Sequence, residues 1–247
     1  MKILEEIIST LKLNAPVREV RIGPFWTAVW SRRCGLASTT FEHDHAFGPP
    51  VREAGRLAEK TALELCEYAL SGSLLERSIG LAAINSLLEV DEQQCRQVNA
   101  AEILAEHGRD KKVCVVGHFP FIPRLEKKVK RLWVLERHPR SGDLPAEEAE
   151  RIIPQADMLA ITGTALINGT MDDLLALCRR DALVMVLGPT TPLSPVWFRH
   201  GVSLVSGTIV TEPETVLKLV SEGIVFSQFH GRGVKLVSMA ADNASTL

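Results

Sequence analysis

The sequence predicts an α/β protein in which a small α+β unit is followed by a parallel α/β sheet. At 247 residues the chain is long enough for two modest domains with buried cores. After residue 110, short apolar runs alternate with stretches whose first residues favour helix starts, which is the pattern of a parallel sheet covered by helices. The runs that we expect to be strands are residues 113–116, 132–135, 158–161, 183–187 and 202–205.

The first half of the chain has the pattern of a small α+β unit. Apolar residues from Leu4 to Leu11 follow the spacing of one helical face, so the chain opens with an amphipathic helix. β-Branched and aromatic residues then predict strands on both sides of the breaker pair Gly23–Pro24. A long helical stripe follows, and after it a helix that is apolar almost all round, as expected for a helix buried between layers. In order, we expect strands at 17–22, 27–30 and 35–38 and helices at 54–69 and 79–88.

A polar stretch at 91–99 and a basic stretch at 109–112 fit a surface connection before a new strand begins. We therefore place a domain boundary near residue 108, which gives domains 1–108 and 109–247. Helix starts in the second domain are marked by residues that favour the first turn of a helix, and Thr170 with Asp173 resembles a capping box. The other markers are Pro145, Ser194–Pro195 and Pro213–Glu214, and a final strand is expected at 234–239.

Charge, the amino-terminal residues and the cysteines indicate which partners, location and metal sites to expect. The formal net charge of −2 gives no electrostatic reason to expect nucleic acid or an anionic membrane as a partner. Acidic residues near the amino terminus interrupt the apolar core that a secretory signal needs, so we expect a cytoplasmic protein. The five cysteines are scattered and form no CxxC pair, which favours reduced thiols over a thiolate metal cluster. A homo-oligomer is left open.

In an open parallel sheet, ligands bind outside the carboxyl ends of the strands, so we expect the residues that follow the apolar runs to form the site. Gly117 follows the first run, but Phe119 stands where a dinucleotide-binding loop has its second glycine, so close approach of a pyrophosphate is not expected. His118 is instead interpreted as a side chain that faces the cleft and ligates a metal or moves a proton. The alternative is a histidine that caps the next helix or bonds to the backbone.

Glu136 ends the second run, 19 residues after Gly117. An acid at about this spacing bonds the ribose hydroxyls in nucleotide-binding sheets. Equally, a carboxylate on the strand beside His118 could form a metal site or an acid–base pair with it. A surface glutamate is the third interpretation, and the sequence does not decide among them.

Two loops are rich in hydroxyl and amide groups. Thr162, Thr164 and Asn168 follow the third run, where hydroxyls and free backbone N–H groups could hold a carboxylate or phosphate. After the fourth run, Gly188 precedes a proline-rich loop that would hold Thr190 and Thr191 rigidly for ligand contact. Helix capping by Thr170 and turn formation by the glycines are the competing explanation for the first loop, and a rigid structural turn is that for the second.

Two further groups are weaker candidates. Asn85 is the polar member of the apolar helix at 79–88 and is expected to reach the cleft. His43 and His45 would share one face of an extended segment and are potential metal ligands, although a solvated loop is favoured because no third ligand is near in sequence.

Three segments, 78–85, 115–120 and 187–195, resemble those of a prokaryotic family of unknown function that is labelled a putative heavy-metal chelation domain. The resemblance extends over nearly the whole chain. It implies an amino-terminal domain similar to the enolase amino-terminal fold, joined to a Rossmann-like domain, with a site in the cleft between them. Soft heavy metals favour thiolates, and the cysteines here do not cluster, so direct sequestration by cysteine is not expected.

These observations predict a protein that binds a small polar ligand between its domains, as an enzyme or a binding protein of metal-chelator or heavy-metal-related metabolism. The ligand would be a small molecule or its metal chelate. Whether a divalent metal ion serves as a cofactor is left open by the sequence. The alternatives are a non-catalytic metal-binding protein and a nucleotide-dependent enzyme with Glu136 on a ribose. His118 and Glu136 are the predicted reactive or metal-binding pair, with His43 and His45 as further metal candidates. The predicted ligand-binding residues are Asn85, Gly117, Phe119, Thr162, Thr164, Asn168, Gly188, Thr190 and Thr191.

Overall fold

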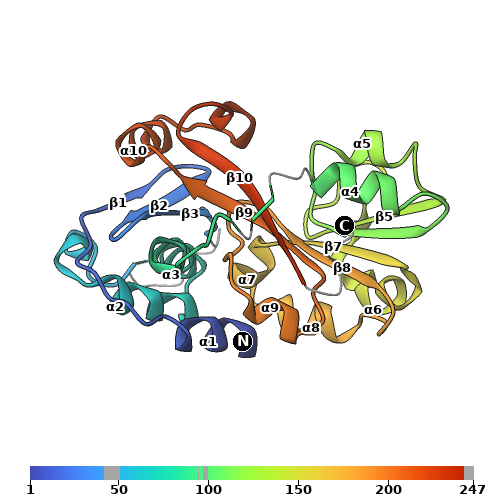
Figure 1. Ribbon diagram of the computed structural model, residues 1–247, viewed down its shortest axis with the longest axis horizontal. Coiled ribbons are helices and arrows are strands. Elements are labelled where there is room, and N and C mark those ends of the chain that lie inside the picture. The colour runs from blue at the N-terminus through green and yellow to red at the C-terminus, as the bar shows by residue number, and fades with distance from the viewer. Residues whose placement is uncertain (42–50, 94, 97–99, 242–247) are drawn as a thin grey trace.

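The computed structural model describes residues 1–41, 51–93, 95–96 and 100–241. Its smaller sheet is antiparallel and consists of β1 (Glu19–Ile22), β2 (Trp26–Trp30) and β3 (Cys34–Ser38), in that order. These strands lie within a few residues of the predicted ones. Together with the larger, mostly parallel sheet described below, they confirm the α/β class (Figure 1).

Helices α1 (Lys2–Ser9), α2 (Ala62–Cys66) and α3 (Leu74–Leu87) belong to the same half of the chain. The prediction of one long helix at 54–69 is wrong, because that segment forms α2 between two short 3-10 turns, η1 (Leu57–Glu59) and η2 (Glu67–Leu70). The break has a physical cause. Residues 60–62 are bonded to residues 15–17, and the Thr61 hydroxyl and the Glu64 carboxylate form a capping box that starts a new helix.

Helix α3 is buried almost all round, as predicted, and lies directly on β3. A Cβ atom added at Gly35 would come within 2.1 Å of the Ala82 carbonyl oxygen, so this strand and this helix approach as closely as their backbones allow. The other face of the small sheet packs against α10 (Pro213–Ser221), with Trp26 and Leu36 in one cluster with Val216 and Val220. A segment near the carboxyl end of the chain therefore completes the core of the amino-terminal unit, as Figure 1 shows.

The larger sheet contains the strands of the described residues after residue 108. They are β4 (Lys112–Val116), β5 (Arg131–Glu136), β6 (Leu144–Pro145), β7 (Met158–Thr162), β8 (Leu183–Leu187), β9 (Leu204–Val210) and β10 (Val234–Ala240). Their order is β10-β9-β8-β7-β4-β5-β6, and only β10 is antiparallel to its neighbour. The chain runs outward from β4 to β6 and then returns to the other side of β4. The six parallel strands thus have the order of a dinucleotide-binding fold, and the direction of winding reverses between β4 and β7.

The helix before β4 and the helices between β4 and β9 are short. They are α4 (Ala100–His107), α5 (Ile122–Leu125), α6 (Ala149–Ile152), α7 (Thr164–Asn168), α8 (Met171–Ala176) and α9 (Val196–Arg199). Further 3-10 turns lie at η3 (Ala146–Glu148), η4 (Ile153–Gln155) and η5 (Phe226–Phe229). The capping box predicted at Thr170 does not form, because no side-chain hydrogen bond caps α8. No helix in the described part of the chain is both long and apolar enough to cross a lipid bilayer.

The close packing of α3 on β3 can be tested with the substitution Gly35→Ala. The added methyl group meets helix backbone that cannot turn aside, so we expect the free energy of unfolding to fall by about 1–3 kcal/mol. Urea unfolding measures this value. Gly72→Ala is the matched control, because its Cβ would meet nothing within 4 Å, and it should change stability by less than about 0.5 kcal/mol. Equal effects of the two substitutions would contradict this packing.

Candidate functional site

A cavity of about 470 Å³ lies at the carboxyl ends of β4, β5 and β7, where the winding of the large sheet reverses. Its lining comes from residues 116–119 at the end of β4, residues 135–137 at the end of β5, and Thr162 and Thr164 at the end of β7. Residues of η3, α6, α7 and α8 close the remaining sides. In open α/β sheets this crevice is the usual ligand position. Three of the five strand endings that the sequence pointed to, those of β4, β5 and β7, are therefore brought together at one cavity, whereas the endings of β8 and β9 are not part of its lining.

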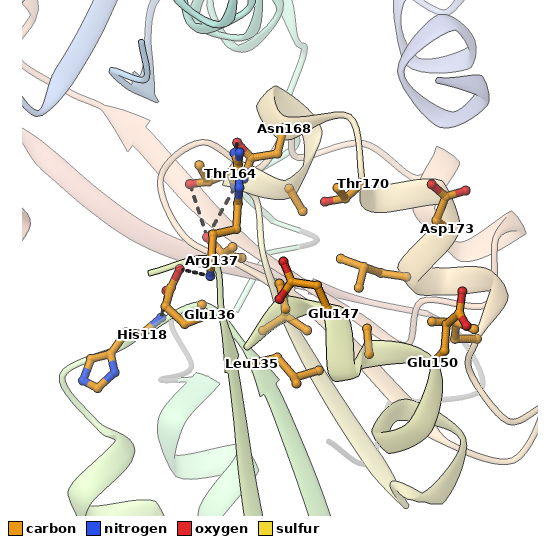
Figure 2. Close-up of a pocket in the computed structure, with 18 of the residues that line it drawn as sticks. His118, Leu135, Glu136, Arg137, Glu147, Glu150, Thr164, Asn168, Thr170 and Asp173 are labelled. Atoms are coloured by element: carbon orange, nitrogen blue, oxygen red, sulfur yellow. Dashed lines mark hydrogen bonds between the residues drawn. The ribbon is translucent and has the colours of Figure 1, made fainter. Parts of the chain in front are cut away.

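The cavity has an apolar part and a polar part. Val116, Leu135, Ala149, Leu174 and Leu177 supply the apolar lining. Side chains that carry charge or can form hydrogen bonds surround them, and Figure 2 shows that these residues come from several elements around the cavity. The labelled polar residues are His118, Glu136, Arg137, Glu147, Glu150, Thr164, Asn168, Thr170 and Asp173. Mostly apolar walls with a few convergent polar groups are typical of small-molecule sites.

His118 does not pair with Glu136 through its ring. Its Nδ1 lies 3.1 Å from Oδ2 of Asp143, and the same oxygen accepts a hydrogen bond from the Arg140 backbone N–H. The Asp143 side chain is only 4% exposed, whereas that of His118 is 23% exposed. Figure 2 shows the imidazole directed away from Glu147 and Glu150. A buried carboxylate thus orients the ring, and Nε2 is the ring nitrogen left for a ligand or a proton.

Glu136 holds two backbone segments together. Its Oε2 accepts a hydrogen bond from the His118 backbone N–H at 3.0 Å, and its Oε1 accepts one from the Arg137 N–H at 2.8 Å. Gly117 makes this turn with a positive φ of 100°, and a Cβ there would lie 3.0 Å from the Thr162 side chain. The carboxylate therefore fixes the loop after β4 against the end of β5, a role that none of the three interpretations from the sequence included.

Arg137 is a cavity residue that the sequence reasoning missed. Its guanidinium Nη1 donates a hydrogen bond of 2.9 Å to Oδ1 of Asn168, so the side chain is held across the end of β5 toward α7. Glu147, Glu150 and Asp173 also line the cavity and were not predicted. Two predicted helix starts lie beside these acids in the sequence. Pro145 precedes Glu147 and Glu150, and Asp173 was part of the predicted capping box. Asp143, in contrast, lies in a loop with no pattern that points to His118.

The predicted ligand-binding residues divide into two groups. Gly117, Phe119, Thr162, Thr164 and Asn168 line the cavity together with His118 and Glu136. Four other predicted residues are absent from its lining, which comes entirely from residues 116–177 of the second half of the chain. These four are Asn85, Gly188, Thr190 and Thr191.

Asn85 and Thr190 join the two halves of the chain instead. The Asn85 side-chain amide donates to the carbonyl oxygens of Leu36 and Thr190, at 2.8 and 3.2 Å. The Thr190 hydroxyl accepts a hydrogen bond of 2.9 Å from the Ser38 N–H, and Thr190 and Thr191 are each 1% exposed. The Ser38 hydroxyl also lies 3.2 Å from that of Thr164, which lines the cavity. The Asn85 amide thus connects α3 to β3 and to the loop after β8, and the half-buried Ser38 hydroxyl connects β3 to that loop and to the cavity edge.

The described residues do not contain a preformed metal site. No group of three His, Cys, Asp or Glu side chains in this part of the chain is arranged to hold an ion. His43 and His45 lie outside the described residues. Burial raises the pKa of Cys34, Cys66 and Cys114 to about 12, so these thiols are protonated at neutral pH and are poor metal ligands.

The buried role of Thr190 leads to a prediction for Thr190→Val. The substitution preserves shape but removes the acceptor for the Ser38 N–H in a part-buried hydrogen bond, so we expect the free energy of unfolding to fall by roughly 1–2 kcal/mol. Chemical denaturation measures the change. Thr170→Val is the control, because Thr170 is exposed, and it should leave stability nearly unchanged. If Thr190→Val were equally harmless, the hydrogen bond would contribute nothing to stability.

Comparisons with known proteins agree with this architecture. Over 177 residues the chain is 29% identical to an uncharacterized protein of Methanocaldococcus jannaschii, which covers 68% of each chain. A crystal structure of a DUF364 protein of unknown function from Desulfitobacterium hafniense is 26% identical, with a TM-score of 0.83 over 97% of this chain and 98% of that one. Its counterpart from Pyrococcus horikoshii is 20% identical, with a TM-score of 0.82 over the same shares.

Two family models match in succession, and both are described as "Putative heavy-metal chelation". The DUF4213 model matches residues 4–88, which contain the small sheet and α3. The DUF364 model matches residues 99–239, which contain the large sheet and the cavity. The resemblance inferred from three sequence segments is therefore confirmed. This chain belongs to the DUF364 family.

Proposed function

We propose that this protein binds a small chelating metabolite, or a metal complex of it, in the cavity at the switch point of the large sheet. The observation that carries the proposal is the cavity itself, about 470 Å³ in volume and lined by polar groups from three strand ends around an apolar part. This volume is within the range of small-molecule sites. The proposed ligand position is within the second half of the chain, and differs from the interdomain cleft expected from the sequence.

Several features favour an organic ligand over a bare metal ion. The described residues offer no group of three metal ligands, and the buried thiols are protonated at neutral pH. The cavity is also larger than an ion needs, and much of its lining is apolar. A metal would therefore enter this cavity as part of a complex whose organic portion makes most of the contacts.

His118 is the residue we assign to proton transfer if the bound ligand reacts. A hydrogen bond from Nδ1–H to Asp143 leaves Nε2 as the basic nitrogen of the neutral ring. Asp143 is a positioning residue in this role, because it orients the imidazole without touching the ligand. Glu136 is a second positioning residue, since its carboxylate fixes the backbone of His118.

A nucleotide is the second candidate ligand, because the parallel strands have the order of a dinucleotide-binding fold and Glu136 ends the second of them. Two observations weigh against it. Both carboxylate oxygens of Glu136 already accept backbone hydrogen bonds. Phe119 stands where close approach of a pyrophosphate requires glycine, and its ring stacks on Phe121 with centroids 5.0 Å apart.

The variant Ala149→Trp tests the location of the site. Ala149 is half-buried and lines the cavity, so an indole at this position fills space that the ligand needs. We expect compounds that bind the wild-type protein to bind the variant at least about tenfold more weakly, a loss of about 1.4 kcal/mol. Calorimetric titration with a panel of amino acids, amines, dicarboxylates and adenosine nucleotides measures the affinities.

Ala176→Trp is the matched control, because Ala176 is exposed and does not line the cavity. It should bind every compound as the wild type does. Unchanged affinities in Ala149→Trp would move the ligand elsewhere and reject the proposal. Binding confined to adenosine nucleotides would favour the second candidate.

Metal analysis separates chelate binding from direct metal binding. We expect protein purified without a histidine tag to retain much less than one equivalent of transition metal after dialysis, as measured by inductively coupled plasma mass spectrometry. One tightly held equivalent that is lost in His118→Ala would show that the chain itself chelates the ion.

A further inference from the structure

The charges around the cavity are unequally distributed. Among the lining residues, Arg137 is the only one with a permanent positive charge, whereas Glu136, Glu147, Glu150 and Asp173 are carboxylates. Arg137, Glu147, Glu150 and Asp173 are exposed and Glu136 is half-buried, so each ion pair with a ligand contributes modestly and the distribution of charge determines which ligand is favoured. The distribution of charge around the cavity therefore indicates which charged groups the ligand carries.

Arg137 is placed to recognise an anionic group. Its backbone N–H is bonded to Glu136 and its Nη1 to Asn168, which fixes both ends of the residue. A guanidinium has five N–H donors, so the fork keeps donors for a planar carboxylate. In the described part of the chain Arg137 forms no ion pair, although four carboxylates line the same cavity.

The carboxylates define a second region. Glu147 extends from η3, Glu150 from α6 and Asp173 from α8. Figure 2 shows Glu150 and Asp173 on the side away from Arg137 and Asn168, with Glu147 between. None of these three carboxylates has a hydrogen bond or an ion pair within the described part of the chain, and Arg151, which follows Glu150, is paired with Glu148. Their negative charge is available to a cationic group of the ligand.

We propose that the ligand is an aminocarboxylate whose carboxylate binds Arg137 and whose ammonium groups face Glu147, Glu150 and Asp173. This inference rests on the function proposed above and names the class of molecule. The hydrocarbon part of the ligand lies against Leu135, Leu174 and Leu177. Amine nitrogens and carboxylate oxygens are also metal donors, so molecules of this class are chelators by their own chemistry.

The same charges act against the alternative ligand. A nucleotide carries several negative charges, and it would bring them among four carboxylates with a single guanidinium to compensate. Like charges that are placed together disfavour the wrong partner, so the acidic side chains select for zwitterions and amines as well as binding them.

Three compounds with nearly the same carbon chain test the assignment. L-lysine has a carboxylate and two ammonium groups, cadaverine lacks the carboxylate, and L-norleucine lacks the side-chain ammonium. We expect calorimetric titration to rank L-lysine first, with each of the other two about fivefold weaker, which is the size expected of a partly exposed ion pair. L-2-aminoadipate, whose second charge is negative, should bind weakest.

Variants connect each difference to a residue. In Arg137→Gln the advantage of L-lysine over cadaverine should disappear, whereas its advantage over L-norleucine should remain. The double variant Glu147→Gln/Glu150→Gln should show the reverse. Arg124→Gln and Glu126→Gln change exposed charges that do not line the cavity and should leave all four affinities unchanged.

Each outcome decides the inference. Tighter binding of L-2-aminoadipate than of L-lysine, equal binding of all four compounds, or no binding of any of them at millimolar concentration would overturn the aminocarboxylate assignment. The proposed function fails separately, when a compound of another class binds wild-type protein and Ala149→Trp equally well.

Discussion

The reversal of winding between β4 and β7 is the constraint on which the site depends. The chain leaves β4 on one side toward β5 and β6 and returns on the other side as β7, so the connections after β4 and β7 diverge. A crevice remains between them at the carboxyl ends of the strands. Gly117 and the carboxylate of Glu136 then fix the loop after β4 against β5, which gives the crevice a defined wall.

The amino-terminal half supports the site from outside the large sheet. Helix α3 and α10 cover opposite faces of the small sheet, and one apolar core extends from α1 through α3 into the large sheet. Asn85, Ser38 and Thr190 form the polar part of this junction, and the Ser38 hydroxyl reaches Thr164 at the cavity edge. The two family models therefore describe segments that pack as one structure around shared hydrogen bonds.

Local patterns in the sequence predicted what depends on local physics. Buried parallel strands are continuous apolar runs, so residues 113–116 and 183–187 located β4 and β8 to within one residue. The helix expected at 54–69 is broken because residues 60–62 bond to residues 15–17, a contact that no apolar stripe contains. Thr190 belongs to a loop whose composition is that of a ligand-binding loop. It is buried, however, and its hydroxyl bonds to Ser38, which lies 152 positions away in the sequence. The pairing of His118 with Asp143 and the place of Arg137 likewise depend on how loops meet in space.

The central claim is that the ligand lies at the switch point of the large sheet, in the second half of the chain. A crystal structure of the protein with a bound small molecule tests it most directly. The account predicts ligand density between the end of β5, residues 117–119 and α8, with Arg137 in contact with an anionic group. Density between β3 and the loop that contains Thr190, with the cavity at the switch point left empty, would contradict it.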